Sequence, residues 1–147
     1  MSEKKIIMVL MFCIFIVLNC LSQNTSDIDA IQKTALDYIE GWYDGDVVRM
    51  ERALHPNLIK RMITNPNSEY SLLNELNKEK MINYTNAGGG KRIPKNSYKI
   101  EVKILDINNN IASVMTKSQY IDYLHLAKFN NKWVIINVLW DINKNKE

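Results

Sequence analysis

Asp122 and His125 are the residues of this chain best suited to acid–base chemistry. A carboxylate can hold an imidazole in one tautomer, so that the ring acts as a general base. Both residues lie in a β-branched and aromatic run over 120–129, which predicts a strand. Positions three apart on a strand point to opposite faces, so the two side chains would cooperate only across a β-bulge. They are therefore separate catalytic candidates and not a predicted pair.

Asp122 and Asn137 form a better-matched pair in the expected hairpin. Asn130-Asn131 joins the 120–129 run to a second apolar run, and this dipeptide tolerates the positive φ angles of a type I′ turn. The first face of this hairpin would carry Asp122, Leu124, Leu126, Trp133, Ile135, Asn137 and Leu139. The second would carry Ile121, Tyr123, His125, Ala127, Val134, Ile136, Val138 and Trp140.

A few polar groups among apolar ones on a rigid sheet are typical of a small-molecule pocket. We expect Asp122 to accept a hydrogen bond from a ligand and Asn137 to bind an amide-like edge. The alternative is that Asp122 bonds a backbone N–H at a strand end, or that both side chains face solvent. The second face is also largely apolar, and large exposed apolar patches are uncommon on monomers. We therefore expect a homodimer through the sheet, with His125 lining either the pocket or that interface.

Further ligand-binding candidates come from the aromatic residues and the other histidine. Tyr38 and Trp42 are four residues apart, so they share a helix face that would form a cavity wall or pack in the core. Tyr123 and Trp140 are the candidates on the hairpin. His55 would either point into the cavity, titrating near neutral pH, or bond the last carbonyls of its helix. The sequence shows no metal-ligand spacing, so neither a metal nor a cofactor is expected.

The hydrophobic pattern predicts helices first and strands afterwards. Helices are expected over about 26–43, 47–54 and 77–86, with Asp46 capping the second. Residues 57–62 would be a short strand or an irregular segment, and 64–70 a loop. From Tyr98 the period changes to two, which predicts three or four antiparallel strands ending in the hairpin. Gly88-Gly89-Gly90 would end the third helix or form a lid over the cavity. This order predicts one α+β domain with helices on one face of a curved sheet.

The first 22 residues have the features of a signal peptide. A basic start at Lys4 and Lys5 precedes an apolar run to Leu18 that is too short to span a bilayer comfortably. Cleavage is expected after Ser22, which leaves a domain over 23–147 without cysteine. Acylation of Cys20 is the alternative, disfavoured because a large residue precedes it. We expect an exported protein, periplasmic or secreted, with no stable membrane span after cleavage. The formal net charge is only +3 and the lysines are scattered, which argues against a nucleic-acid partner.

Four segments of the chain are distinctive in combination: Tyr38–Asp46, Met50–Pro56, Asp122–Leu126 and Lys132–Trp140. Together they resemble the putative lumazine-binding family, a branch of the nuclear transport factor 2-like superfamily, which is also called cystatin-like or SnoaL-like. The resemblance covers nearly all of 23–147. It implies a cone-shaped α+β fold, in which a strongly bent antiparallel sheet wraps around a long first helix and a cavity opens between helices and sheet.

The resemblance implies a small-molecule-binding protein, with a lumazine- or pterin-like planar compound as the ligand. Ketosteroid isomerases and polyketide-cyclase-like proteins share this fold, so the fold alone does not choose an activity. One alternative is an isomerase or cyclase with Asp122 or His125 as general base. Another is a dimeric interaction module whose cavity is filled by its own side chains.

Overall fold

The structure is a computed structural model that describes residues 26–65, 67 and 69–144. The chain divides into two units, residues 1–30 and 31–147, and, apart from the start of the first helix at residue 26, the account below concerns the second unit by itself. The predicted signal peptide and its Cys20 lie outside the described residues, so cleavage and acylation stay predictions.

The described residues form three α-helices where the sequence predicts them. The first covers 26–44, α2 covers Val47–Ala53 and α3 covers Lys78–Asn86. Asp46 caps α2 as predicted, because its carboxylate accepts a hydrogen bond from the Arg49 backbone N–H at 3.0 Å. Asn77 caps α3 in the same way. Gly88 follows α3 with φ +72°, a left-handed conformation that glycine adopts without strain.

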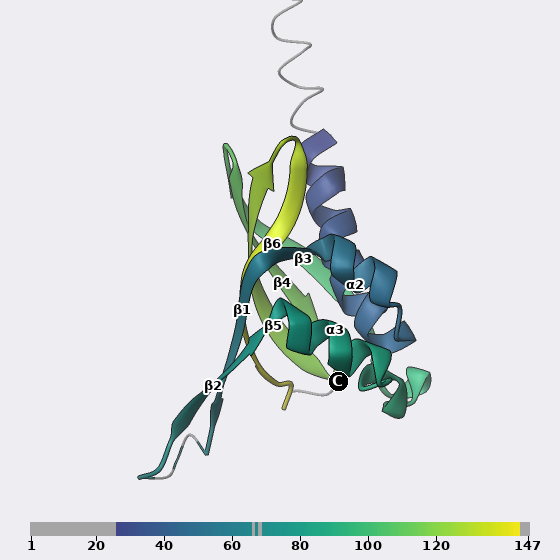
Figure 1. Cartoon of the computed structure of the whole chain (residues 1–147), viewed down its shortest axis with the longest axis vertical. Coiled ribbons are helices and arrows are strands. Elements are labelled where there is room, and N and C mark those ends of the chain that lie inside the picture. The colour runs from purple at the N-terminus through teal and green to yellow at the C-terminus, as the bar shows by residue number, and fades with distance from the viewer. Residues whose placement is uncertain (1–25, 66, 68, 145–147) are drawn as a thin grey trace, which may run out of the picture. The chain divides into compact units, whose positions relative to one another are not determined.

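A six-stranded curved sheet makes up most of the rest (Figure 1). The strands in chain order are β1 Leu54–Thr64, β2 Leu72–Asn77, β3 Glu101–Asn108, β4 Ile111–Lys117, β5 Tyr120–Phe129 and β6 Lys132–Ile142. Their order across the sheet is β2-β1-β6-β5-β4-β3. Every neighbouring pair is antiparallel except β1 and β6, which run parallel. The predicted α+β class is thus confirmed, with a mixed sheet in place of a purely antiparallel one.

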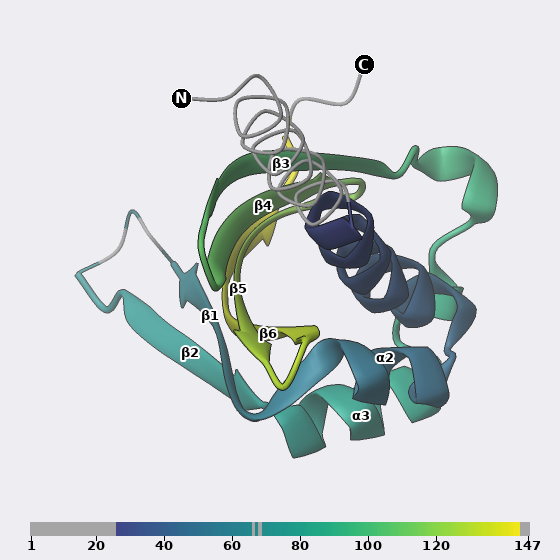
Figure 2. The same ribbon diagram turned by 90° about the horizontal axis from the view of Figure 1, so that it is seen from above.

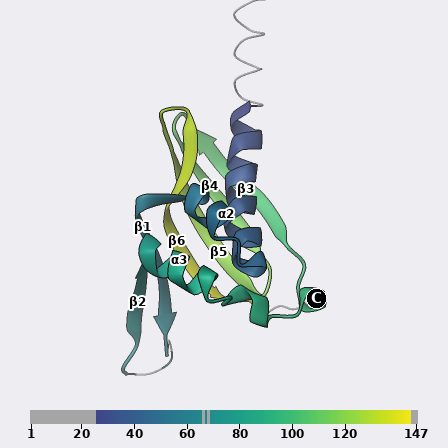
Figure 3. The same ribbon diagram turned by 45° about the vertical axis from the view of Figure 1, so that its right-hand side comes forward.

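Strand β1 contains 57–62, where a short strand was one of the two predictions, but it begins earlier than expected, and strand β2 was not predicted. β1 begins at Leu54 and includes Pro56, where a helix end was predicted, and its pairing with β6 is irregular between Leu54 and Ile59. That irregular stretch accommodates a proline that has no N–H to donate. β2 lies directly before α3, where no strand was predicted. It is an edge strand that runs directly into α3 and extends with the end of β1 away from the helices (Figure 3).

The concave side of the sheet curves around the helical residues 31–44, as seen from above in Figure 2. The core forms there. It contains Ile31, Ala35 and Ile39 from the helix and Val114, Leu124, Ile135 and Val138 from the sheet, all at most 1% exposed. Apolar burial of this kind contributes roughly 25 cal/mol per Å² and is the main stabilising term of a domain without disulfides.

Asp37 links the first helix to α2 through ion pairs and hydrogen bonds. Its carboxylate accepts hydrogen bonds from Arg52 Nε and Nη2, both at 2.7 Å, and from Arg49 Nε at 3.0 Å. Burial by itself would raise the pKa of Asp37, but the two guanidinium groups outweigh it and lower the pKa below its usual value. This network fixes the helix that carries the aromatic candidates Tyr38 and Trp42.

The final hairpin is present, but its register changes once along its length. Asn130 and Asn131 have φ of 48° and 60°, which confirms the predicted turn. The pairing is regular from this turn to Leu126 opposite Ile135, after which His125 pairs with Asn137. Ile136 is therefore an extra residue, a β-bulge, on β6. A shift of one residue moves every later side chain of β6 to the other face.

Candidate functional site

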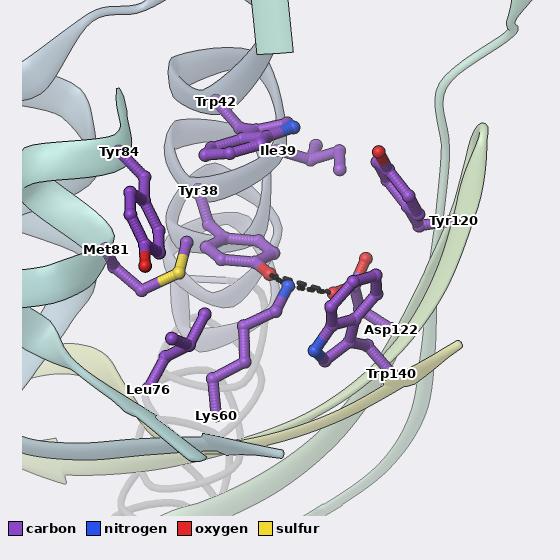
Figure 4. A pocket seen from close by; sticks show the side chains of 10 residues that line it. All are labelled: Tyr38, Ile39, Trp42, Lys60, Leu76, Met81, Tyr84, Tyr120, Asp122 and Trp140. Carbon is purple, nitrogen blue, oxygen red and sulfur yellow. Dashed lines mark hydrogen bonds and ion pairs between the residues drawn. The ribbon is translucent and has the colours of Figure 1, made fainter. Parts of the chain in front are cut away.

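Three polar side chains meet on the concave side of the sheet. Asp122 on β5 and Lys60 on β1 form an ion pair with Nζ to Oδ1 at 2.8 Å. The Tyr38 hydroxyl donates to the same Asp122 oxygen at 2.8 Å and accepts from Lys60 Nζ at 2.6 Å. Figure 4 shows the three groups converging from helix and sheet. They form a closed triangle of hydrogen bonds, here called the Tyr38–Lys60–Asp122 cluster.

The cluster is buried, which makes its charges costly unless they are paired. Asp122 is 1% exposed, Tyr38 2% and Lys60 7%. A fourth group, the Thr116 hydroxyl, approaches the other Asp122 oxygen, Oδ2, at 3.4 Å. Burial first, and then the neighbouring carboxylate of Asp122, raise the pKa of Tyr38 well above its usual value. The phenol therefore stays a neutral donor throughout the physiological range.

Aromatic side chains wall the space in front of the cluster. Trp42 from the helix, Tyr84 from α3, Tyr120 from β5 and Trp140 from β6 surround a cavity of about 210 Å³ (Figure 4). The Tyr120 and Trp140 rings meet edge to face at 5.2 Å, and Lys60 Nζ lies 4.5 Å from the centre of the Trp140 ring. Ile39, Leu76 and Met81 complete the lining. An apolar, aromatic hollow with a few convergent polar groups is the usual form of a small-molecule site.

The sheet order explains how these residues meet. β6 lies between β1 and β5, so Lys60 and Asp122 approach each other across it. Trp140 is the β6 partner of Asp122, and Val138 is the β6 partner of Lys60. Because the bulge at Ile136 lies before both, it turns Val138 and Trp140 to the concave face. The bulge thus places Trp140 in the cavity.

A family model described as "Putative lumazine-binding" matches residues 26–141, most of the chain. The chain belongs to this family. The predicted resemblance is therefore confirmed, over a span that includes every residue of the cavity. No curated protein matches the sequence.

Comparison with solved structures confirms that the chain has the nuclear transport factor 2-like fold. An NTF2-like protein of unknown function from Silicibacter pomeroyi DSS-3 is 13% identical, with a TM-score of 0.65, and covers 82% of this chain and 98% of its own. An NTF2-like protein of unknown function from Shewanella baltica OS155 is 16% identical, with a TM-score of 0.63, and covers 82% and 97%. A cystatin-like domain of unknown function from Nostoc punctiforme PCC 73102 is 11% identical, with a TM-score of 0.58, and covers 81% and 78%.

The structure separates the predicted ligand-binding residues of this family member into two groups. Tyr38, Trp42, Asp122 and Trp140 line the cavity together. Trp140 was expected on the face opposite Asp122, and the bulge corrects this. The cluster and the ring contacts hold three of the four, Tyr38, Asp122 and Trp140, in place.

Asn137, Tyr123 and His125 lie on the convex face of the sheet, away from the cavity. The prediction that Asn137 shares a face with Asp122 is wrong, because the bulge shifts Asn137 opposite His125. Its Nδ2 lies 3.2 Å from His125 Nδ1, and its Oδ1 accepts from Arg61 at 3.0 Å. His125 is exposed on this face, so the proposed use of His125 as a general base in the cavity is also wrong.

His55 has neither of its two predicted roles. It lies at the start of β1, where its Nδ1 accepts the Asn57 backbone N–H at 3.1 Å. Its ring stacks on Phe129 at 4.8 Å. These contacts lie in the irregular first part of β1, and His55 is not among the residues that line the cavity.

Two of the three glycines after α3 lie against Trp42 in the cavity wall. A Cβ on Gly89 would lie 2.5 Å from Trp42 Cη2, and a Cβ on Gly90 would lie 2.3 Å from the Trp42 carbonyl oxygen. Only glycine permits so close an approach. The predicted role of the glycines as helix terminator is confirmed at Gly88, and the following two residues hold Trp42 against the cavity.

Lys60 lines the cavity but was missed by the sequence interpretation, as were Tyr84 and Tyr120. A signal was present: Leu58, Lys60 and Met62 alternate with Asn57, Ile59 and Arg61, which places Lys60 on the same strand face as the fully buried Leu58. A lysine on a buried face is rarely found without a partner. Within the described part of the chain, no cluster of His, Cys, Asp or Glu could hold a metal ion, and no helix there is long and apolar enough to cross a bilayer.

Proposed function

We propose that this member of the lumazine-binding family binds a small, partly planar organic ligand in the cavity and does not transform it. The observation that carries the proposal is the buried Tyr38–Lys60–Asp122 cluster at the wall of an aromatic hollow. Aromatic rings on several sides favour a flat ligand, and the cluster offers polar groups that fix its orientation. The family description supports a lumazine- or pterin-like compound.

Binding without catalysis is favoured by the state of Asp122. A general base needs an oxygen within reach of the substrate proton. Oδ1 of Asp122 already accepts hydrogen bonds from an ammonium group and a phenol, and Oδ2 accepts one from the Thr116 hydroxyl. With His125 on the convex face, the isomerase or cyclase alternative has no unoccupied base among the described cavity residues.

Tryptophan fluorescence tests the proposal, because Trp42 and Trp140 line the cavity. Titration with lumazine, riboflavin and a pterin should give saturable quenching with at least one of them. Tyr84→Ala should weaken that binding tenfold or more, since Tyr84 lines the cavity but is 49% exposed and its truncation should not unfold the protein. Tyr70→Ala is the matched control, an exposed tyrosine outside the cavity. Equal affinities in both variants would contradict the proposal.

We also propose that the protein acts after export and as a homodimer through the convex face of the sheet. Export is supported by the signal-peptide features of the first 22 residues and by the restriction of both cysteines to them. The dimer is supported by Ile63, Tyr123 and Leu139, which are 47–52% exposed on neighbouring strands of one face. A two-fold axis places such a patch against itself. A monomeric mass in light scattering at micromolar concentration would refute the dimer, and an unprocessed chain in the cytoplasm would refute export.

A further inference from the structure

The lining of the cavity carries two formal charges that cancel. Of its ten residues, only Lys60 and Asp122 are charged, and they contact each other at 2.8 Å. Tyr38 and Tyr120 in the wall are neutral, because burial, followed by the charge of Asp122, raises the pKa of both above the usual value. A ligand that enters therefore meets a surface with no net charge.

This balance disfavours a charged ligand. An anion that approached Lys60 would share one ammonium group with Asp122, so one of two negative charges would remain uncompensated in a site shielded from water. A cation that approached Asp122 would meet Lys60 in the same way. A neutral ligand leaves the ion pair intact and still contacts the aromatic walls.

The hydrogen bonds of Lys60 indicate which polar atom the ligand presents. Two of its three N–H groups are taken by Tyr38 Oη and Asp122 Oδ1. The hydrogen bonds of the described residues include no third acceptor oxygen for Nζ, and the Trp140 ring lies 4.5 Å away. A carbonyl oxygen of a ligand in the cavity can accept the third N–H, and it brings no charge.

We propose that the cavity selects an uncharged, planar, carbonyl-bearing ligand of about two fused rings and rejects an anion of the same shape. The proposal rests on the proposed function and names its ligand class. The size follows from the volume of about 210 Å³, which lies below the roughly 300–1,000 Å³ of sites for drug-sized ligands. The selection follows from the charge balance of the Tyr38–Lys60–Asp122 cluster.

Calorimetric titration with 2-naphthamide and 2-naphthoate tests this, because the two probes share shape and ring system and differ in charge. The wild-type protein should bind the amide at least tenfold more tightly than the carboxylate. Asp122→Asn leaves the charge of Lys60 unbalanced, so the ratio of the two affinities should fall tenfold or more and move toward the carboxylate. Equal affinities in the wild type, or an unchanged ratio in Asp122→Asn, would overturn the proposal and leave the proposed binding function standing.

A second variant covers the case in which Asp122→Asn does not fold. Tyr84→Lys adds an unpaired cation from a half-exposed position of the cavity wall, with Tyr84→Met as its uncharged control. Only the lysine variant should shift preference toward the carboxylate, and an equal ratio in both would overturn the proposal. If neither naphthalene probe nor any of the ring compounds above binds the wild type, the proposed function fails and this inference fails with it.

Discussion

Replacing the members of the buried ion pair singly and together is the sharpest test of the cluster. At 2.8 Å and an effective dielectric constant of about 20, two unit charges attract each other by about 6 kcal/mol before desolvation. Taking each ion out of water costs several kcal/mol, so the pair as a whole contributes little. The loss of one partner is different, because the other charge remains buried and unpaired. Lys60→Met and Asp122→Leu should each lower the free energy of unfolding by about 3–5 kcal/mol.

The double variant, with Lys60→Met and Asp122→Leu, leaves no buried charge at this position. Its main remaining defect is the Tyr38 hydroxyl, which donates to Asp122 in the native cluster. A buried donor without an acceptor costs about 1–3 kcal/mol. The double variant should therefore be more stable than either single variant, although it carries both substitutions.

Urea unfolding of the four proteins, followed by circular dichroism, gives this double-mutant cycle. Residues that did not interact would give additive effects, with a loss in the double variant of about 6–10 kcal/mol from the two single values. Additivity would refute the reasoning. So would a loss below 1 kcal/mol in Lys60→Met, because it would mean that the ammonium group is exposed in solution.

Three further outcomes follow from the contacts described. Gly90→Ala should lower the free energy of unfolding by about 1–3 kcal/mol, because the added Cβ would lie 2.3 Å from the Trp42 carbonyl oxygen; an unchanged urea midpoint would contradict that packing. The lowered pKa of Asp37 means that its stabilising effect is present above its unfolded pKa, near 4, and is lost as pH falls through the lower folded value. Urea midpoints between pH 2 and 7 should thus decline on acidification less steeply in Asp37→Asn. Burial raises the pKa of Tyr43 to about 12, so between about pH 10 and 12 the folded state binds more protons than the unfolded state and stability falls as pH rises. Tyr43→Phe should reduce this alkaline loss, and tyrosinate absorbance should show one late-titrating phenol fewer.

The fold was largely predictable because its signals are local. The caps at Asp46 and Asn77, the glycine after α3 and the Asn130-Asn131 turn each act through neighbouring backbone groups. β1 was only partly predicted, because Pro56 suggested a break where the strand begins. The parallel pairing of β1 with β6 joins segments far apart in sequence, and no local pattern specifies it.

The candidate site was predictable only up to the bulge. Asp122, Tyr38 and Trp42 follow from strand and helix periodicity, and the structure places them in one cavity. The same reasoning fails for Asn137, because strict alternation along β6 places its side chain on the wrong face of the sheet. Lys60 could be placed on a buried face, but its partner lies two strands away, and pairing at that distance depends on the sheet order.

The bulge at Ile136 also determines how β6 tolerates mutation. Odd-numbered positions such as Trp133 and Ile135 are buried before it, and even-numbered positions such as Val138 are buried after it. A saturation scan of β6 should therefore show sensitivity at every second residue, with a single reversal of phase at Ile136. Insertions and deletions follow a stricter rule. One residue gained or lost beyond the bulge turns Trp140 out of the cavity, and a second change of opposite sign in the same strand restores it.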